Sequence, residues 1–159
     1  MTTKMDRSKY FEGAGAGLCV GAVAALAQLT HAPMMLGSLG ATSMLLFALP
    51  GSPMARPRSV IGGHLLSSAI GLAGLHLLGP SWWSLGLAVA LAITLMLATR
   101  TTHLPAASNV LIVYSVQPGL SFLLAPTLVG ALTVLALSFV WKSIQSRIER
   151  ISMPKVVSE

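Results

Sequence analysis

The sequence predicts an all-α membrane protein with about six transmembrane elements, and two observations predict it. Of the 159 residues, 54% are hydrophobic and only 9% are charged, whereas soluble domains carry roughly 25% charged residues. Between Glu12 and Lys142 the only charged side chains are Arg56, Arg58 and Arg100. These arginines divide the interior into three uncharged blocks of about 40 residues, each long enough for two spans of roughly 20 residues.

The placement of the cations predicts the orientation. If each uncharged block is a helical hairpin, all ten Lys and Arg lie on the same side as the termini. Loops rich in Lys and Arg face the cytoplasm. We therefore expect a multi-pass protein of the bacterial cell inner membrane with both termini cytoplasmic. The net charge of +6 then indicates contact with anionic lipid headgroups rather than with nucleic acid.

The elements are expected in the order long, short, long, which then repeats. Four long spans are predicted at 13–30, 59–79, 83–99 and 120–141, and two short ones at 34–49 and 105–117. At 1.5 Å per residue the short elements reach only about 24 Å and about 20 Å, less than the ~30 Å hydrocarbon core. A four-span protein in which the short elements are re-entrant is the competing topology.

Further features are expected at the two ends of the chain. Gly17 and Gly21 in the first span are four residues apart, a spacing that favours close helix packing. Residues 142–159 are expected to form a cytoplasmic amphipathic helical tail, because isoleucines at 144, 148 and 151 share one face among cations. The whole chain, 1–159, is predicted to be a single transmembrane domain.

A short motif indicates an internal repeat. Thr-His-Ala-Pro at 30–33 recurs as Thr-His-Leu-Pro at 102–105, and both short elements end in Pro-Gly. Three crossings per copy require the second copy, about 83–141, to be inverted relative to the first, about 13–79. Inverted repeats with short helices are typical of transporters that bind their ligand near the membrane midplane. Chance remains an alternative, because Thr-x-x-Pro also suits helix starts in general.

The absence of acids points to an anion. No Asp or Glu lies between Glu12 and Glu149, so a cation carrier would have no counter-charge. Hydroxyls, histidines and the free N–H groups at helix N-termini all favour a negatively charged ligand. Three membrane histidines could suggest a metal site, but no carboxylate or thiol accompanies them in sequence, so we expect no metal and no cofactor.

These arguments yield a candidate substrate-binding site between the two short elements. An ionisable residue within the membrane is a functional candidate by default, and His64 or His103 could carry a co-transported proton. The predicted substrate-binding residues are Ser38, Thr42, Ser43, His64, His103, Ser108 and Asn109.

Several stretches resemble a known family. Residues 37–43, 48–58 and 61–67 are similar to the HPP family of integral membrane proteins, which is named for a His-Pro-Pro motif. The matching place here is His103-Leu104-Pro105, with leucine instead of the middle proline. The resemblance implies four spans, if the short elements are counted as re-entrant, and transport of a small anion, with nitrite as the leading candidate.

Two other classes of function remain open. A non-transporting membrane protein, such as an assembly factor or sensor, would need no continuous polar path at the midplane. A membrane enzyme would need a metal or a nucleophile–base pair, and neither is visible in the sequence, so we expect no enzyme. Because a chain this short buries little surface, we also expect a homo-oligomer.

Overall fold

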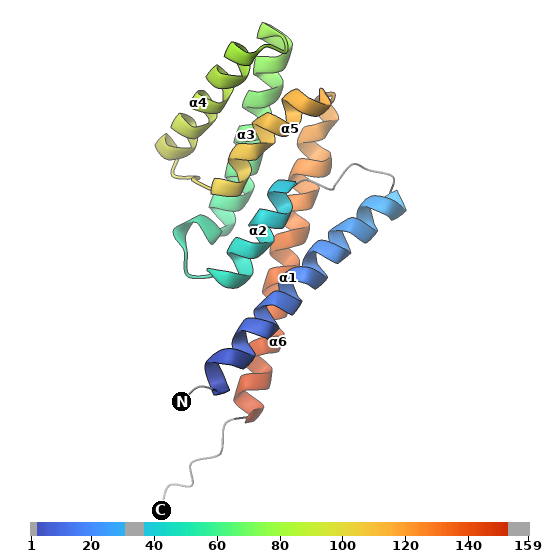
Figure 1. The fold of residues 1–159 in the computed structure, drawn as a ribbon, viewed down its shortest axis with the longest axis vertical. Helices are drawn as coiled ribbons and strands as arrows, with labels where there is room; N and C mark the ends of the chain where they lie inside the picture. Colours follow the sequence, from blue (N-terminus) through green and yellow to red (C-terminus); the bar gives the residue numbers. More distant parts are fainter. Residues whose placement is uncertain (1–2, 31–36, 153–159) are drawn as a thin grey trace, which may run out of the picture.

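The computed structural model describes residues 3–30 and 37–152. In these residues it has six α-helices and no strand, which confirms the all-helical prediction (Figure 1). The helices are α1 Thr3–Thr30, α2 Gly37–Ala48, α3 Pro57–Leu78, α4 Trp82–Ala98, α5 Ser108–Val116 and α6 Val129–Ser152. Shorter turns connect them: 3₁₀ turns at Pro53–Ala55, Leu104–Ala107 and Leu120–Leu123, and a π turn at Leu124–Leu128.

Three helical segments in the described residues are long and apolar enough to cross a membrane: Tyr10–Leu29, Pro57–Leu78 and Leu120–Ile148. As predicted, α2 and α5 are short, with 12 and 9 residues. The remaining predicted long span, at 83–99, corresponds to α4, which has 17 residues and reaches only about 26 Å. It stops at Ala98 because the chain turns there: Arg100 is left-handed, with φ 55°, and the N–H of Thr101 donates to the carbonyl of Met96.

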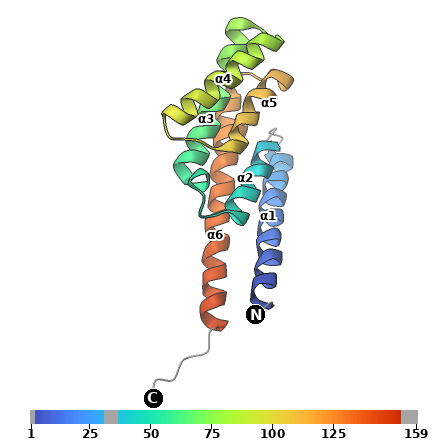
Figure 2. The same cartoon turned by 60° about the vertical axis from the view of Figure 1, so that its left-hand side comes forward.

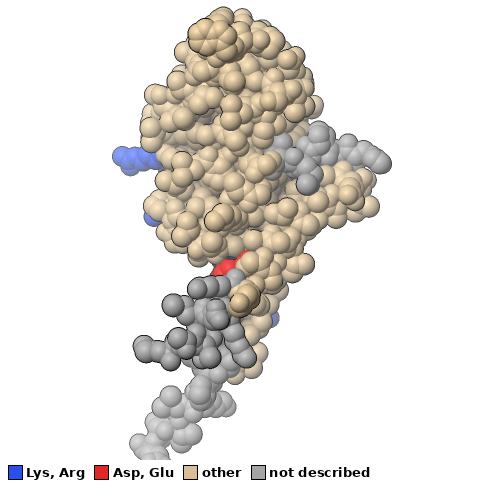
Figure 3. All heavy atoms as spheres, viewed as in Figure 1, with Lys and Arg blue, Asp and Glu red and all other residues tan. Residues whose placement is uncertain are grey.

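Successive helices run in alternating directions, and the first residues of α1 lie at the same end of the molecule as the last residues of α6 (Figures 1 and 2). The bundle presents many apolar side chains outward, including Leu77 and Trp82, which are 81% and 86% exposed. The face seen in Figure 3 carries few charged side chains over the bundle itself. Such a surface suits lipid rather than water. The cytoplasmic placement of the termini remains a prediction.

The contacts between helices can be compared with the predicted inverted repeat, which stays a prediction. Helix α1 packs against α2 and α6, while α4 packs against α5 and α3. Exchanging α1 with α4, α2 with α5 and α3 with α6 converts the first set of neighbours into the second. Equivalent helices also run in opposite directions (Figure 1), as an inverted repeat requires. The predicted pairing of His31 with His103 remains a prediction, because His31 lies outside the described residues.

Glycines bring α3 close to the segment that follows α4. A Cβ atom on Gly63 would lie 2.8 Å from the Cβ of His103, and one on Gly71 would lie 3.2 Å from the Cα of Val110. Real Cβ atoms essentially never approach another atom to less than 3.0 Å. The residue at position 63 therefore sets how closely His103 can approach α3.

The α1 glycines behave differently from expectation. Gly15 is the closely packed one, since a Cβ there would meet the rings of Phe47 and Trp141 at 2.6 Å. Gly17 and Gly21 have no neighbour within 4 Å of an added Cβ. The prediction that these two mediate close packing is wrong within the described chain, because α1 turns its other face to α2 and α6.

The N-terminal part of α1 packs against the middle of α6. The rings of Phe11 and Trp141 lie 4.5 Å apart, and the Gln145 amide donates to the Glu12 carboxylate at 3.3 Å. Helix α6 continues from there to Ser152, and the three isoleucines of the predicted tail are 44%, 50% and 85% exposed. The rest of the predicted tail, 153–159, lies outside the described residues.

Candidate functional site

The two short elements meet beside α3. The 3₁₀ turn Leu104–Ala107 packs against both α2 and α3. His103 precedes this turn in an extended conformation. Pro105 is the second residue of the turn, near its start, where a missing N–H group leaves no hydrogen bond unmade. The conformation at 103 directs the imidazole toward α2, where Thr42 lies in the middle of the helix.

Thr42 is the centre of a buried hydrogen-bond cluster. Its Oγ1 lies 2.9 Å from Nε2 of His103 and 3.0 Å from Nε2 of His64. The same oxygen lies 2.7 Å from the main-chain carbonyl of Ser38. Thr42, His64 and His103 are each 0% exposed. Two imidazoles and a carbonyl therefore converge on one hydroxyl that water does not reach in this structure.

The cluster continues along α3 and α5. The Asn109 amide nitrogen donates to Nδ1 of His64 at 3.1 Å and to the hydroxyl of Ser68 at 2.9 Å. Ser68 in turn shares a hydrogen bond of 3.0 Å with the hydroxyl of Thr127. At the opposite end, Nδ1 of His103 lies 2.8 Å from the carbonyl of Met54.

We call this set the polar chain: Met54 carbonyl, His103, Thr42, His64, Asn109, Ser68 and Thr127. His64 and Ser68 lie roughly 10 Å and roughly 16 Å along α3, a helix of about 33 Å. The polar chain therefore extends from the α2–α3 connection to about the middle of α3, which is the depth expected for a transporter site.

A basic pocket adjoins one end of the polar chain. It has a volume of about 570 Å³ and is lined by Pro53, Met54, Arg56, Arg58, Ser59, Leu97, Arg100 and Thr102. We call it the arginine pocket. Met54 belongs to both features, because its carbonyl binds His103 while the residue lines the pocket. No carboxylate occurs in the sequence between Glu12 and Glu149 to neutralise the three arginines from nearby in the chain.

Two of these arginines differ in what fixes their position: a side-chain hydrogen bond for Arg58 and a left-handed backbone for Arg100. Arg58 donates from Nη2 to the carbonyl of Thr99 at 2.9 Å, which ties the start of α3 to the end of α4. Arg100 occupies the left-handed position after α4, with φ 55°, where glycine is usually found. Non-glycine residues in this conformation carry backbone strain and cluster at functional sites. The turn therefore places a cation where glycine would fit with less strain.

The structure brings four of the seven predicted site residues together: Thr42, His64, His103 and Asn109. Ser38 contributes its carbonyl. Its hydroxyl, the hydroxyl of Ser67 and Oδ1 of Asn109 are buried and have no hydrogen-bond partner among the described residues. A buried polar group without a partner costs about 1–3 kcal/mol.

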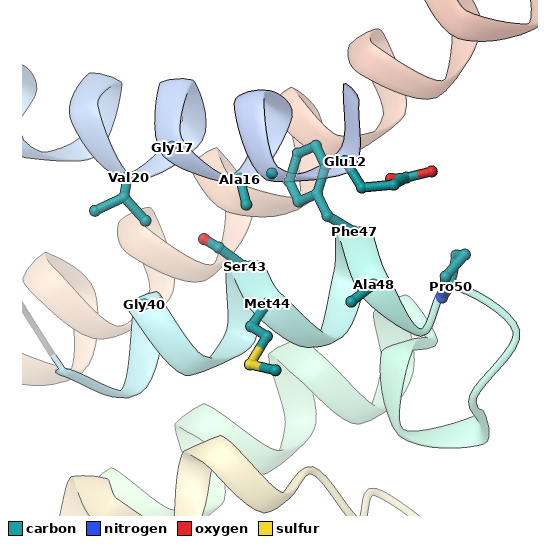
Figure 4. A pocket seen from close by; sticks show the side chains of 11 residues that line it. Glu12, Ala16, Gly17, Val20, Gly40, Ser43, Met44, Phe47, Ala48 and Pro50 are labelled. Atoms are coloured by element: carbon teal, nitrogen blue, oxygen red, sulfur yellow. The ribbon is translucent and has the colours of Figure 1, made fainter. Parts of the chain in front are cut away.

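The other two predicted site residues lie outside the polar chain. Ser43 donates to the carbonyl of Leu39 at 3.0 Å and contacts Cys19 of α1. It lines a different, mainly apolar cavity of about 860 Å³ between α1 and α2 (Figure 4). The Ser108 hydroxyl donates to the carbonyl of Pro105 at 2.8 Å and so closes its own turn. Both satisfy local carbonyls instead of joining the buried cluster.

The sequence reasoning missed Ser68, Thr127 and the carbonyl of Met54. Ser68 had a signal, because it follows His64 by one helical turn and must share its face. Thr127 had none, since its proximity to Ser68 depends on how the π turn packs against α3. Among the described residues no three His, Cys, Asp or Glu side chains form a group that could hold a metal ion, and both histidine Nε2 atoms of the cluster point to Thr42.

The fold and this site define a class: a polytopic helical membrane protein with a polar core between two short helices. A family model described as HPP, transmembrane region, matches residues 3–150. The chain belongs to this family.

Curated relatives agree with the membrane assignment. The chain is 35% identical over 115 residues to a transmembrane protein of Dictyostelium discoideum, covering 67% of this chain and 40% of the relative. A second Dictyostelium discoideum transmembrane protein is 34% identical over 109 residues, covering 64% of this chain and 35% of the relative. The chain thus spans well under half the length of these relatives. No solved structure matches it.

Proposed function

We propose that this protein transports a small inorganic anion across the membrane, with nitrite as the leading candidate substrate. One observation carries the proposal: a pocket with three arginines and no acid shares a residue with a buried polar chain that reaches the centre of the bundle. This arrangement has the two parts that a small anion needs, an attractive entrance and a set of hydrogen-bonding groups beyond it.

The arginine pocket supplies the entrance. Clustered cations at the mouth of a low-dielectric cleft raise the local concentration of anions, and guanidinium groups bind oxyanions in a paired geometry. A cavity of about 570 Å³ is far larger than a triatomic anion. The ion can therefore enter with part of its water shell and lose that water further in.

Beyond the pocket, the polar chain supplies substitutes for the lost water. Stripping water from an anion is costly unless hydrogen bonds replace it. The unpartnered hydroxyls of Ser38 and Ser67 can donate such bonds, and the Asn109 amide nitrogen can do so when it leaves His64 or Ser68. The chain is closed in this structure, since its side chains bond to one another. Transport therefore requires a rearrangement that exchanges these internal bonds for bonds to the ion.

The test removes a cation without disturbing the turn that carries it. Glycine fits the left-handed backbone at position 100 without strain, so Arg100→Gly should fold at least as stably as the wild type. We expect its KM for nitrite in proteoliposome uptake to rise about tenfold, because a charge-assisted hydrogen bond contributes about 1.5–3 kcal/mol.

The matched control is Arg147→Gly, which removes a cation from the exposed part of α6. Its KM should stay within about twofold of the wild type, because exposed charges contribute little. An unchanged KM in Arg100→Gly would contradict the role of the arginine pocket. Absence of nitrite uptake by the wild type would favour a non-transporting membrane protein, such as an assembly factor or sensor.

A further inference from the structure

We propose that the anion crosses together with one proton. This proton binds His103, and the hydroxyl of Thr42 changes its hydrogen-bond acceptor when the proton binds. The inference rests on the proposed anion transport and adds the co-substrate of the same site. It follows from counting the protons that the hydrogen bonds around Thr42 require.

Thr42 has one hydroxyl proton and three partners. A threonine hydroxyl donates one hydrogen bond and can accept two. Its partners are the Ser38 carbonyl, which can only accept, and Nε2 of both His64 and His103. If the hydroxyl donates to Ser38, both Nε2 atoms must carry protons and donate to Thr42. All three contacts are then satisfied at once.

The second nitrogen of His103 fixes the charge of that state. Nδ1 of His103 lies 2.8 Å from the Met54 carbonyl, an acceptor, so Nδ1 also carries a proton. With all contacts formed, His103 is therefore a cation with protons on both nitrogens. When His103 is neutral, Nε2 has no proton and must accept one. The Thr42 hydroxyl then turns to His103 and leaves the Ser38 carbonyl.

His64 does not share this ambiguity. The Asn109 amide nitrogen donates to its Nδ1, so the ring is neutral with its proton on Nε2. It donates to Thr42 in both states. One proton on Nε2 of His103 thus decides which way the Thr42 hydroxyl points, and His64 holds the hydroxyl oxygen in place while it turns.

Among the described residues, no carboxylate faces His103 to balance its charge. The groups facing it are Ser38 and Thr42 from α2, His64 from α3, Asn109 by way of His64 from α5, and the Met54 carbonyl. The charged groups nearest in sequence, Arg56, Arg58 at the start of α3 and Arg100 after α4, are cations.

A buried cation without a counter-charge is strongly unfavourable. The transported anion is then the counter-charge, so proton binding and anion binding favour each other by the same free energy.

The cycle is balanced in atoms and charge. When the polar chain opens toward the arginine pocket, a proton from water there binds Nε2 of His103, the Thr42 hydroxyl turns from Nε2 to the Ser38 carbonyl, and the anion binds. On the other side the anion leaves, Nε2 returns its proton to water, and the hydroxyl turns back. No electron is transferred. The net movement is one anion and one proton, which is electrically neutral.

The experiment uses the full chain in vesicles with the membrane potential clamped at zero. Equilibrium exchange of isotope-labelled nitrite measures anion transport alone. Initial net uptake with the outside one pH unit more acidic measures proton coupling. Rates from protein-free vesicles are subtracted, because neutral nitrous acid crosses lipid unaided. In the wild type we expect exchange, and net uptake that rises up to about tenfold with the pH gradient. In a separate measurement the potential is clamped away from zero, and we expect net uptake to stay unchanged.

Variants separate His103 and Thr42 from the other groups. His103→Gln and Thr42→Val should show reduced exchange and net uptake that no longer responds to the pH gradient, while Thr42→Ser restores the response. His76→Gln is the matched control, because His76 bonds only the Leu72 carbonyl of its own helix among the contacts described. It should respond as the wild type does. Circular dichroism and size exclusion check that each variant is folded.

The outcomes distinguish the two proposals. Exchange in the wild type without a response to the pH gradient, or with a response to potential, would overturn the proton inference and leave anion transport standing. A full pH response in both folded His103→Gln and folded Thr42→Val would do the same. No exchange by the wild type would overturn both.

Discussion

The two halves of this bundle have similar helix packing and different chemistry. Where α1, α2 and α6 meet, the interface is made of apolar side chains such as Val23, Leu39 and Leu135, and its polar contacts include long ones to Cys19. Where α3 meets α5 and the turn after His103, it buries hydrogen-bonded polar groups, with His64 and Asn109 both 0% exposed. The interface of α1, α2 and α6 has the composition of a packing interface, and the interface of α3 with α5 and the turn has that of a binding site.

The difference teaches that a similar arrangement of helices does not bring similar chemistry with it. Short helices in matching positions create a place where backbone and side chains can meet near the midplane. The amide and one imidazole of the polar chain come from different predicted copies: Asn109 lies in the second short element, and His64 lies in α3 of the first copy.

The largest expected effect comes from deleting the amide in the polar half. Asn109→Leu removes the donor to both His64 and Ser68 without adding charge. We expect nitrite flux to fall about 100-fold, the loss produced by about 2.7 kcal/mol, while the protein still assembles. Flux in vesicles and detergent-stable yield measure the two quantities.

The matched variant in the apolar half is Ser43→Ala, which removes a hydroxyl bonded to its own helix. Its flux should stay within about twofold of the wild type. If Ser43→Ala lost as much flux as Asn109→Leu, the division into a packing half and a site half would be wrong.

A smaller effect is expected from adding one methyl group at a close approach. Gly63→Ala would place a Cβ 2.8 Å from that of His103, and overpacking of this kind costs about 1–3 kcal/mol. The melting temperature in detergent should fall by several degrees, and flux should fall with it.

Gly17→Ala is the counterpart on α1, where nothing lies within 4 Å. Alanine has the higher helix propensity by up to about 1 kcal/mol, so this variant should melt at the wild-type temperature or above it. A Gly17→Ala protein that melted lower than Gly63→Ala would show that α1 is more tightly covered than the single chain indicates.

The smallest effect should appear at the far end of the polar chain. Thr127→Val keeps the shape of the side chain and leaves Ser68 without its partner. Ser68 still receives the Asn109 amide proton, so we expect a decrease in flux of only about threefold, equivalent to roughly 0.7 kcal/mol. A loss equal to that of Asn109→Leu would show instead that the ion passes directly beside Thr127.

The sequence predicted what depends on local pattern. Uncharged blocks and prolines predicted the helices and the shortness of α2 and α5. The cost of burying an amide or imidazole identified Asn109, His64 and His103. The sequence could not predict that Ser43 and Ser108 donate hydrogen bonds to carbonyls of their own segments, because the partner of a hydroxyl depends on the local geometry. Nor could it predict the arginine pocket, which forms because the turn after α4 packs beside the start of α3.

The close approach at Gly63 has a mechanical consequence. Because Gly63 and Gly71 have no side chain, α3 lies directly against His103 at the first position and against Val110 of α5 at the second, so we expect a tilt of α3 to move both. Thr42, on α2, is hydrogen-bonded to both imidazoles through one oxygen atom. A shift of α2 that moves Thr42 would break both of these hydrogen bonds together, so under the proposed mechanism the path would open in one step.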